Sequence, residues 1–140
     1  MWLKNCHEVV KMDKINNLSN KKKAQLYRDN YKNWKEYGLE NNGFFIIFNG
    51  ILEHKKLKKI SGNALRLYIY LGIYSKNMTG EVWHSNQRIA EYFGKSERTI
   101  RGWMKELEDI NLIKRMRLEY DGEPHVFLQP YDQGKTRKKD

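Results

Sequence analysis

The sequence has little of what several common classes of protein depend on. It holds one cysteine, Cys6, so an intramolecular disulfide is impossible and a reducing, cytoplasmic setting fits. The opening residues MWLKNCHEVV contain no long apolar run, so no secretory signal is expected. The longest apolar stretch, Phe44 to Phe48, is far too short to span a bilayer. A soluble, cytoplasmic protein with no membrane contact is therefore predicted.

Residue patterns that carry catalysis or hold metals are also lacking. The four histidines are scattered without the spacing of a metal site. No Walker phosphate loop is present, because the glycines lack the Lys-Ser/Thr that such a loop requires. No pair of carboxylates lies in an apolar setting. We therefore expect a protein that is not an enzyme and that has no cofactor and no metal site.

Positive charge is what the sequence has in excess, with 27 basic against 17 acidic side chains and a net charge of +10. Residues 1–60 carry 13 basic and 6 acidic side chains, residues 61–131 carry 10 and 9, and residues 132–140 carry 4 and 2. A polyanionic partner is the natural interpretation, with a merely soluble basic protein as the alternative. The flanks would then supply sequence-independent attraction to phosphate.

The chain divides into a basic N-terminal extension (1–60), a central domain (61–131) and a basic, disordered tail (132–140). Within the extension, Ser19 is a good N-cap for a helix over 20–37 that Gly38 would end. Its apolar stripe has helical spacing and consists of Ala24, Tyr27, Tyr31 and Trp34. Three interpretations stay open: a solvated helix that docks on its own core, a dimerisation helix, or an arm on the DNA backbone.

The rest of the extension has weaker signals. Asn41 to Gly43 reads as a turn, and Phe44 to Phe48 as a short buried strand or extended segment. One or two helical turns could follow over residues 51–57. The run of lysines within residues 55–59 is either a solvated surface or a phosphate contact.

The central domain begins with a helix that Ser61 would cap and that would end near Ser75. It is apolar over much of its circumference, as expected of a central core helix. A short strand is predicted over residues 81–84. A second helix is expected over 86–93, with Ser85 as its N-cap.

Gly94 is expected in the left-handed conformation that commonly ends a helix. Ser96 would then cap a third helix that runs to about Ile110. The inner face of this helix has apolar residues at helical spacing, namely Ile100, Trp103, Met104, Leu107 and Ile110. Two helices joined by so short a turn must cross steeply.

Two strands should follow as a hairpin, over residues 112–120 and 125–131, with Asp121-Gly122 as its turn. On the first strand, Met116, Leu118 and Tyr120 would face one way, and Arg115, Arg117 and Glu119 the other. The tip of the hairpin is acidic, so it is poorly suited to a minor groove. We therefore expect Arg115 or Arg117 to touch phosphate instead.

The outer face of the third helix carries the functional argument. Arg98, Arg101 and Lys105 share one face, and arginine can contact guanine through two hydrogen bonds. Gly102 beside them permits close approach to a duplex. The end of the helix is acidic, with Glu106, Glu108 and Asp109. Insertion of the N-terminal half into the major groove is therefore predicted.

The stretch SNQRIAEYFGKSERTIRGWMKELEDINLIKR resembles the winged helix-turn-helix domains of bacterial DNA-binding proteins. Their common pattern falls on Ser85, Ile89, Ala90, Phe93, Gly94, Ser96, Arg98, Thr99, Ile100, Met104 or Trp103, Leu107, Leu112 and Ile113. The resemblance implies an α+β, mainly helical fold in which the helix from Ser96 is the recognition helix and the hairpin is the wing. It also implies that Ser96, Arg98 and Thr99 meet DNA.

The preceding GFFIIFNGILEHKKLKKISGNALRLY resembles the lead-in of plasmid and phage replication-initiator and replisome-organiser modules of low-GC Gram-positive bacteria. Those proteins usually have more chain after the wing. The leading hypothesis is a regulator of transcription on a mobile element, a homodimer through the N-terminal extension that reads double-stranded DNA. An accessory protein of replication or partition and a protein-interaction module are the alternatives. The expected DNA-binding residues are Lys95, Ser96, Glu97, Arg98, Thr99, Arg101, Gly102, Lys105, Arg115 and Arg117.

Overall fold

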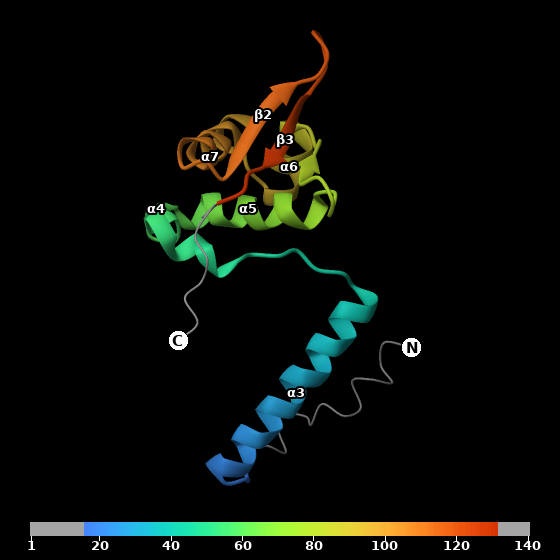
Figure 1. Ribbon diagram of the computed structural model, residues 1–140, viewed down its shortest axis with the longest axis vertical. Helices are drawn as coiled ribbons and strands as arrows, with labels where there is room; N and C mark the ends of the chain where they lie inside the picture. The colour runs from blue at the N-terminus through green and yellow to red at the C-terminus, as the bar shows by residue number, and fades with distance from the viewer. Residues whose placement is uncertain (1–15, 132–140) are drawn as a thin grey trace. The chain divides into compact units, whose positions relative to one another are not determined.

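The computed structural model describes residues 16–131 and divides the chain into two compact units, Met1–Phe44 and Phe45–Asp140 (Figure 1). The predicted disordered tail, residues 132–140, lies outside the described residues. The second unit begins at Phe45, earlier than the boundary after residue 60 expected from the sequence. The reason is that the segment before Ser61 contributes to the core, since Ile51 is buried there.

The first unit holds one described helix, α3 (Asn20–Asn41). Ser19 caps it as predicted, and its hydroxyl accepts a hydrogen bond from the Lys22 backbone N–H. Gly38 does not end the helix, contrary to the prediction, because its carbonyl still accepts from the Asn42 N–H at 3.0 Å. A glycine inside a helix costs only about 1 kcal/mol relative to alanine, and it keeps its N–H. None of the residues of α3 is buried.

The apolar run after α3 forms no strand, so of the two predicted alternatives the buried strand is wrong and the extended segment is what the structure shows. Its backbone is extended, but Ile46, Ile47 and Phe48 are exposed. Only Phe45 packs, with its ring against Tyr68 and against the helix backbone at Gly72, where a Cβ would lie 2.3 Å from that ring. A strand needs a neighbour for its ladder, and no strand of the described sheet is adjacent to this run.

The predicted helical turns are present after this run, as a 3₁₀ segment η1 (Asn49–Lys55) and the short helix α4 (Lys56–Lys59). His54 and Lys55 have positive φ values of 56° and 58°, which break the helical path between the two. The lysine run is not entirely a solvated surface. Lys56 donates to the Ile110 carbonyl at 2.6 Å, at the C-terminal end of a later helix.

Three helices form the core of the second unit: α5 (Gly62–Tyr74), α6 (Asn86–Phe93) and α7 (Glu97–Asp109). The predicted caps Ser61, Ser85 and Ser96 are confirmed, because each hydroxyl accepts from the backbone N–H three residues on. α5 is the central helix. Its buried residues are Ala64, Leu67, Tyr68, Tyr70, Leu71 and Gly72.

A three-stranded antiparallel sheet completes the unit, in the order β1-β3-β2. The strands are β1 (Glu81–Val82), β2 (Ile113–Arg117) and β3 (Pro124–Leu128). The prediction of a two-residue turn at Asp121-Gly122 is wrong, because pairing stops at Arg117 opposite Pro124 and residues 118–123 form the loop. Pro124 has no N–H to extend the ladder further.

The arrangement of α5, β1, α6, α7 and the β2–β3 hairpin is a winged helix-turn-helix fold, which confirms the predicted fold class (Figure 1). The core is continuous from α5 through α7 into the sheet, because Leu67, Leu107 and Ile113 are all buried in one cluster. Each such side chain contributes roughly 1.5–3 kcal/mol of hydrophobic stabilisation. The hairpin loop and the outer face of α7 project from this core, and they are the places where function was expected. Within residues 16–131, none of the helices combines the length and the apolar character that a membrane crossing requires.

Candidate nucleic-acid interface

A three-residue turn joins α6 to α7. Gly94 has the predicted left-handed conformation, with φ 64° and ψ 38°. The Gly94 and Lys95 N–H groups donate to carbonyls of the last turn of α6, Gly94 to Glu91 at 3.3 Å and Lys95 to Ala90 at 3.0 Å. Ser96 then begins α7 as its N-cap. The turn fixes how α7 leaves α6, because the Gly94 and Lys95 N–H groups are both hydrogen-bonded to the end of α6.

The two faces of α7 differ sharply, as the apolar spacing predicted. Ile100, Trp103, Met104 and Leu107 are buried. The aromatic ring of Trp103 packs edge-on against Phe93 of α6, with 5.5 Å between ring centroids. Because this face is locked into the core, the opposite face has a fixed orientation relative to the turn and the wing.

The outward face of α7 holds the predicted basic residues. Arg98, Arg101 and Lys105 are exposed and follow one another at spacings of three and four. Neither Arg98 nor Arg101 has a hydrogen bond or ion pair with another residue in 16–131. Lys95, Glu97 and Gly102 are exposed beside them, and nothing lies within 4 Å of where a Gly102 Cβ would be.

Two of the predicted contacts already have hydrogen bonds within the protein. The Ser96 hydroxyl accepts from the Thr99 N–H at 3.1 Å and lies 2.9 Å from the Thr99 hydroxyl. Ser96 thus has its capping role whether or not DNA is present. Its hydroxyl and that of Thr99 form one polar group at the start of α7, where the helix dipole favours an anion such as phosphate.

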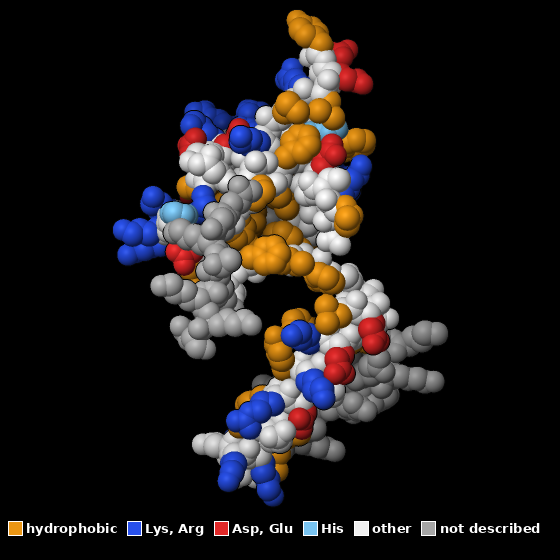
Figure 2. Space-filling view, viewed as in Figure 1, with side chains coloured by type: hydrophobic (Ala, Val, Ile, Leu, Met, Phe, Trp, Pro, Cys, Tyr) orange, Lys and Arg blue, Asp and Glu red, His pale blue; other side chains and the backbone are white. Residues whose placement is uncertain are grey.

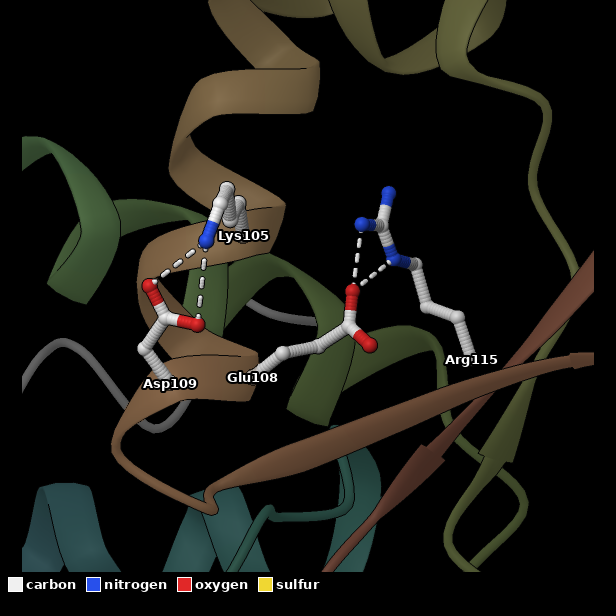
Figure 3. A network of polar contacts seen from close by, with 4 residues as sticks. All are labelled: Lys105, Glu108, Asp109 and Arg115. Atoms are coloured by element: carbon white, nitrogen blue, oxygen red, sulfur yellow. Dashed lines mark hydrogen bonds and ion pairs between the residues drawn. The ribbon is translucent and has the colours of Figure 1, made fainter.

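The acidic end of α7 is attached to the rest of the domain. Glu106 accepts from the Ser61 N–H at 2.8 Å and the Ser61 hydroxyl at 2.7 Å, which ties α7 to the start of α5. Glu108 pairs with Arg115 of β2, and Asp109 pairs with Lys105 at 3.1 Å (Figure 3). The last of these pairs is exposed, at 73% and 61% of the side-chain surfaces, so it holds Lys105 only weakly.

The two predicted wing residues lie in different surroundings. Arg115 points back toward α7, where its guanidinium donates to the Glu108 carboxylate (Figure 3). Arg117 is exposed at the end of β2 and has no ion pair among residues 16–131. Beyond it, the loop carries Glu119, Asp121 and Glu123. Of the two arginines, only Arg117 is open to a phosphate without loss of an internal contact.

An aromatic cluster packs the C-terminal end of α6 against α5. Tyr70 of α5 lies against Tyr92 and Phe93, and its hydroxyl is 2.8 Å from His84 Nδ1. Burial, and to a lesser extent the nearby Arg88, lower the pKa of His84. The imidazole is therefore neutral at pH 7, and it acts as a packing and hydrogen-bonding group rather than as a source of positive charge.

Sequence reasoning missed the structural roles of Glu106 and Lys56. Ser61 was identified as a cap, but its acidic partner lies 45 residues away. Lys56 binds the carbonyl at the end of α7 across 54 residues. No local signal marks either contact, because both depend on how α5 and α7 pack. In the described part of the chain, no three or more His, Cys, Asp or Glu side chains are grouped to hold a metal ion.

The comparison with protein families agrees with this geometry. Residues 58–113 match the model of a family described as a helix-turn-helix domain, and the match extends from α4 to the first residue of β2. No curated protein and no solved structure is significantly similar to the chain. The matched segment includes α5, α6, the Gly94 turn and the whole of α7. The chain thus carries a helix-turn-helix domain, and this supports DNA binding.

Proposed function

We propose that the chain is a sequence-specific double-stranded DNA-binding protein whose helix α7 enters the major groove. The observation that carries the proposal is the outward face of α7, where Arg98 and Arg101 are exposed and have no internal partner while the opposite face is buried. Arginine side chains held on a rigid helix can donate two hydrogen bonds to the edge of guanine. Gly102, with no side chain, lets the helix backbone approach the bases.

The arrangement of acids on α7 supports insertion by its N-terminal half. Glu106 and Glu108 hold α5 and β2, so their end of the helix faces the protein. Carboxylates near the phosphates would be repelled, whereas Lys95 and the Ser96–Thr99 hydroxyls lie at the other end. Arg117 is the wing residue best placed to contact a phosphate, with Arg115 held by Glu108.

The proposed biological role is regulation of transcription on a plasmid or phage, by a homodimer that reads an inverted repeat. The support is the resemblance of the central domain to the winged helix-turn-helix domains of bacterial DNA-binding proteins, together with the basic segments that flank it. A role at a replication origin is the second candidate, favoured by the resemblance of the segment before α5 to replication modules. The wing loop favours a third, a protein-interaction module, because it is acidic and exposes Leu118 and Tyr120 at 56% and 99%.

Selection of bound duplexes from a random pool tests the proposal, followed by binding measurements on the selected site and on unrelated duplex. We expect Arg98→Ala/Arg101→Ala to lower the preference for the selected site over unrelated duplex by at least about 30-fold, since each of two bidentate contacts discriminates by about 1–3 kcal/mol. Weaker, salt-sensitive binding to any duplex should persist.

The matched control is Lys58→Ala/Lys59→Ala, which removes the same charge from exposed lysines of α4. It should weaken binding to both duplexes alike. The proposal fails if the α7 variant keeps the wild-type preference, or if the pool yields no enriched sequence. Two inverted half-sites in the selected sequences would support a homodimer, and a single undivided site would count against it.

A further inference from the structure

Helix α3 has a surface that the winged domain does not explain. It is 22 residues long, yet none of its residues is buried. Long helices in globular proteins usually gain their stability from a packed apolar face, so a helix of this kind is expected to have an external partner. The side chains on the surface of α3 indicate what kind of molecule this partner is.

The first feature of this surface is a line of exposed aromatic rings. Tyr27, Tyr31 and Trp34 are 51%, 60% and 66% exposed. They are spaced by four and three residues, so they follow one side of the helix at intervals of about 6 and 4.5 Å along its axis. The rings of Tyr31 and Trp34 already touch, with centroids 5.6 Å apart. We call these three residues the aromatic line.

The second feature is a line of positive charge beside the first. At about 100° per residue, the side chains of Lys21, Arg28, Lys32 and Lys35 leave α3 within about 60° of one another, next to the aromatic line. The acids Asp29, Glu36 and Glu40 leave on the far side of this basic line, roughly opposite the rings. In Figure 2 the acidic side chains of α3 lie toward one side of the helix and its hydrophobic side chains toward the other, with basic side chains between and beside them.

We propose that the aromatic line and the basic line together bind a single-stranded nucleic acid. Phosphates would follow the lysines and Arg28, and unpaired bases would stack on Tyr27, Tyr31 and Trp34. Exposed aromatic rings interleaved with a basic track are how proteins bind single strands without sequence preference. The phosphates of a duplex could contact the basic line, but its bases could not stack on the rings, because they are already stacked on one another. The aromatic line therefore favours the unpaired strand.

The distribution of charge disfavours a second copy of α3 as the occupant. If two helices paired through their aromatic lines, the residues flanking the seam would face the other copy. One flank is the basic line, and the other holds Lys23, Asn30 and Tyr37. No acid borders the seam on either side, so each basic line would lack an acidic partner. A polyanion has no such conflict.

Binding of a fluorescently labelled 20-nucleotide oligo(dT) to the full chain tests the proposal, measured by anisotropy. We expect Tyr27→Ala/Tyr31→Ala/Trp34→Ala to weaken binding at least tenfold, since losing one stacked ring already costs roughly 5- to 150-fold. Tyr27→Phe/Tyr31→Phe, which keeps the rings, should bind like the wild type. Leu26→Ala, which shortens an apolar side chain away from the aromatic line, is the matched control and should also leave binding unchanged. Circular dichroism at 222 nm checks that α3 is still helical in each variant.

The basic line is tested separately through the salt dependence. Arg28→Gln/Lys32→Gln/Lys35→Gln should lower the slope of log affinity against log salt by about 2, at roughly 0.7 for each lost contact with a single strand. Neither set of α3 substitutions should alter the sequence preference on duplex DNA. Conversely, Arg98→Ala/Arg101→Ala should leave oligo(dT) binding unchanged. A failure of the single-strand proposal for α3 is therefore distinguishable from a failure of the proposed duplex binding by α7.

Four results would overturn the inference. One is oligo(dT) binding that survives removal of the three rings. Another is an equal loss of affinity for a 20-base-pair duplex, since the surface would then be a general polyanion site. A third is binding to vesicles containing phosphatidylserine that depends on the same rings while oligo(dT) fails to bind. The last is a dimer in sedimentation that the ring substitutions convert to a monomer, which would assign the aromatic line to a second copy.

Discussion

At the scale of single residues, two glycines with similar surroundings have opposite roles. Gly94 lies between α6 and α7 with φ 64°, a conformation that residues with a Cβ adopt at a cost. Gly102 lies inside α7, where an ordinary helical residue would fit. Nothing lies within 4 Å of an added Cβ at either position. Adding a methyl group should therefore change stability only through the backbone conformation. The change in the free energy of unfolding should have opposite signs at Gly94 and Gly102.

We expect Gly94→Ala to lower the free energy of unfolding by about 1–2 kcal/mol. Gly94→Asn should cost less, because asparagine tolerates the left-handed region better. Gly102→Ala should raise the free energy of unfolding by about 0.5–1 kcal/mol through helix propensity. Urea denaturation followed by circular dichroism measures all three. A shift of the same sign for both alanine variants would contradict this account.

At the scale of elements, two acidic side chains near the C-terminal end of α7 are paired with other elements, whereas Arg98 and Arg101 nearer its start have no hydrogen bond or ion pair within residues 16–131. The C-terminal half of α7 is joined to α5 through Glu106 and to β2 through the Glu108–Arg115 pair. The latter pair is partly buried, at 33% and 27% exposure, whereas Lys105 and Asp109 are exposed. The two ion pairs therefore differ in function. One positions the wing against α7, and the other leaves Lys105 able to move to a ligand.

Double-mutant cycles test this difference. We expect a coupling free energy of about 1 kcal/mol or more between Glu108 and Arg115, measured with glutamine at each position, because a less hydrated pair is screened less. The coupling between Lys105 and Asp109 should be about 0.3–0.5 kcal/mol, as for exposed pairs one helical turn apart. Urea denaturation at low salt gives both values. Equal couplings would mean that Arg115 is not a structural residue.

At the scale of the whole molecule, the two compact units differ in how they are stabilised. The unit from Phe45 onward has a continuous core, while α3 buries none of its residues. The segment before α5 belongs to that core, through Ile51 and the Lys56 contact with Ile110. The boundary at Phe45 therefore separates α3, which contributes little to the stability of the winged fold, from a segment that contributes to its core. Removing α3 should leave the winged fold intact, and removing the segment after it should not.

We expect a fragment of residues 45–140 to unfold cooperatively with a Tm within a few degrees of the full chain. A fragment of residues 61–140 should be much less stable, since loss of a buried side chain such as Ile51 alone costs about 2–5 kcal/mol. Thermal unfolding followed by circular dichroism compares them. The unit boundary would be refuted if both fragments were equally destabilised.

Local signals account for what could be predicted from the sequence. Ser61, Ser85 and Ser96 cap helices because a side-chain oxygen three residues before an N–H is a local geometry. The buried face of α7 follows from apolar spacing. The contacts of Glu106, Lys56 and Arg115 depend on packing between different elements of the fold, so no local sequence pattern predicts them. The strand alternative for the run from Phe44 to Phe48 was wrong because the composition of this run suits a strand, whereas strand formation also needs a neighbouring strand to pair with.

The two faces of α7 have separate roles, and this separation affects how the protein could evolve. The buried face and the acidic end of α7 hold the domain together, while Arg98 and Arg101 make no hydrogen bond or ion pair within residues 16–131. Substitutions at these outward positions are therefore nearly free of any penalty to folding. Under the proposed function, a lineage carrying this scaffold could acquire a new DNA target through two or three exchanges on one face of α7, without passing through unstable intermediates. The same property makes α7 a practical site for redirecting the protein in the laboratory.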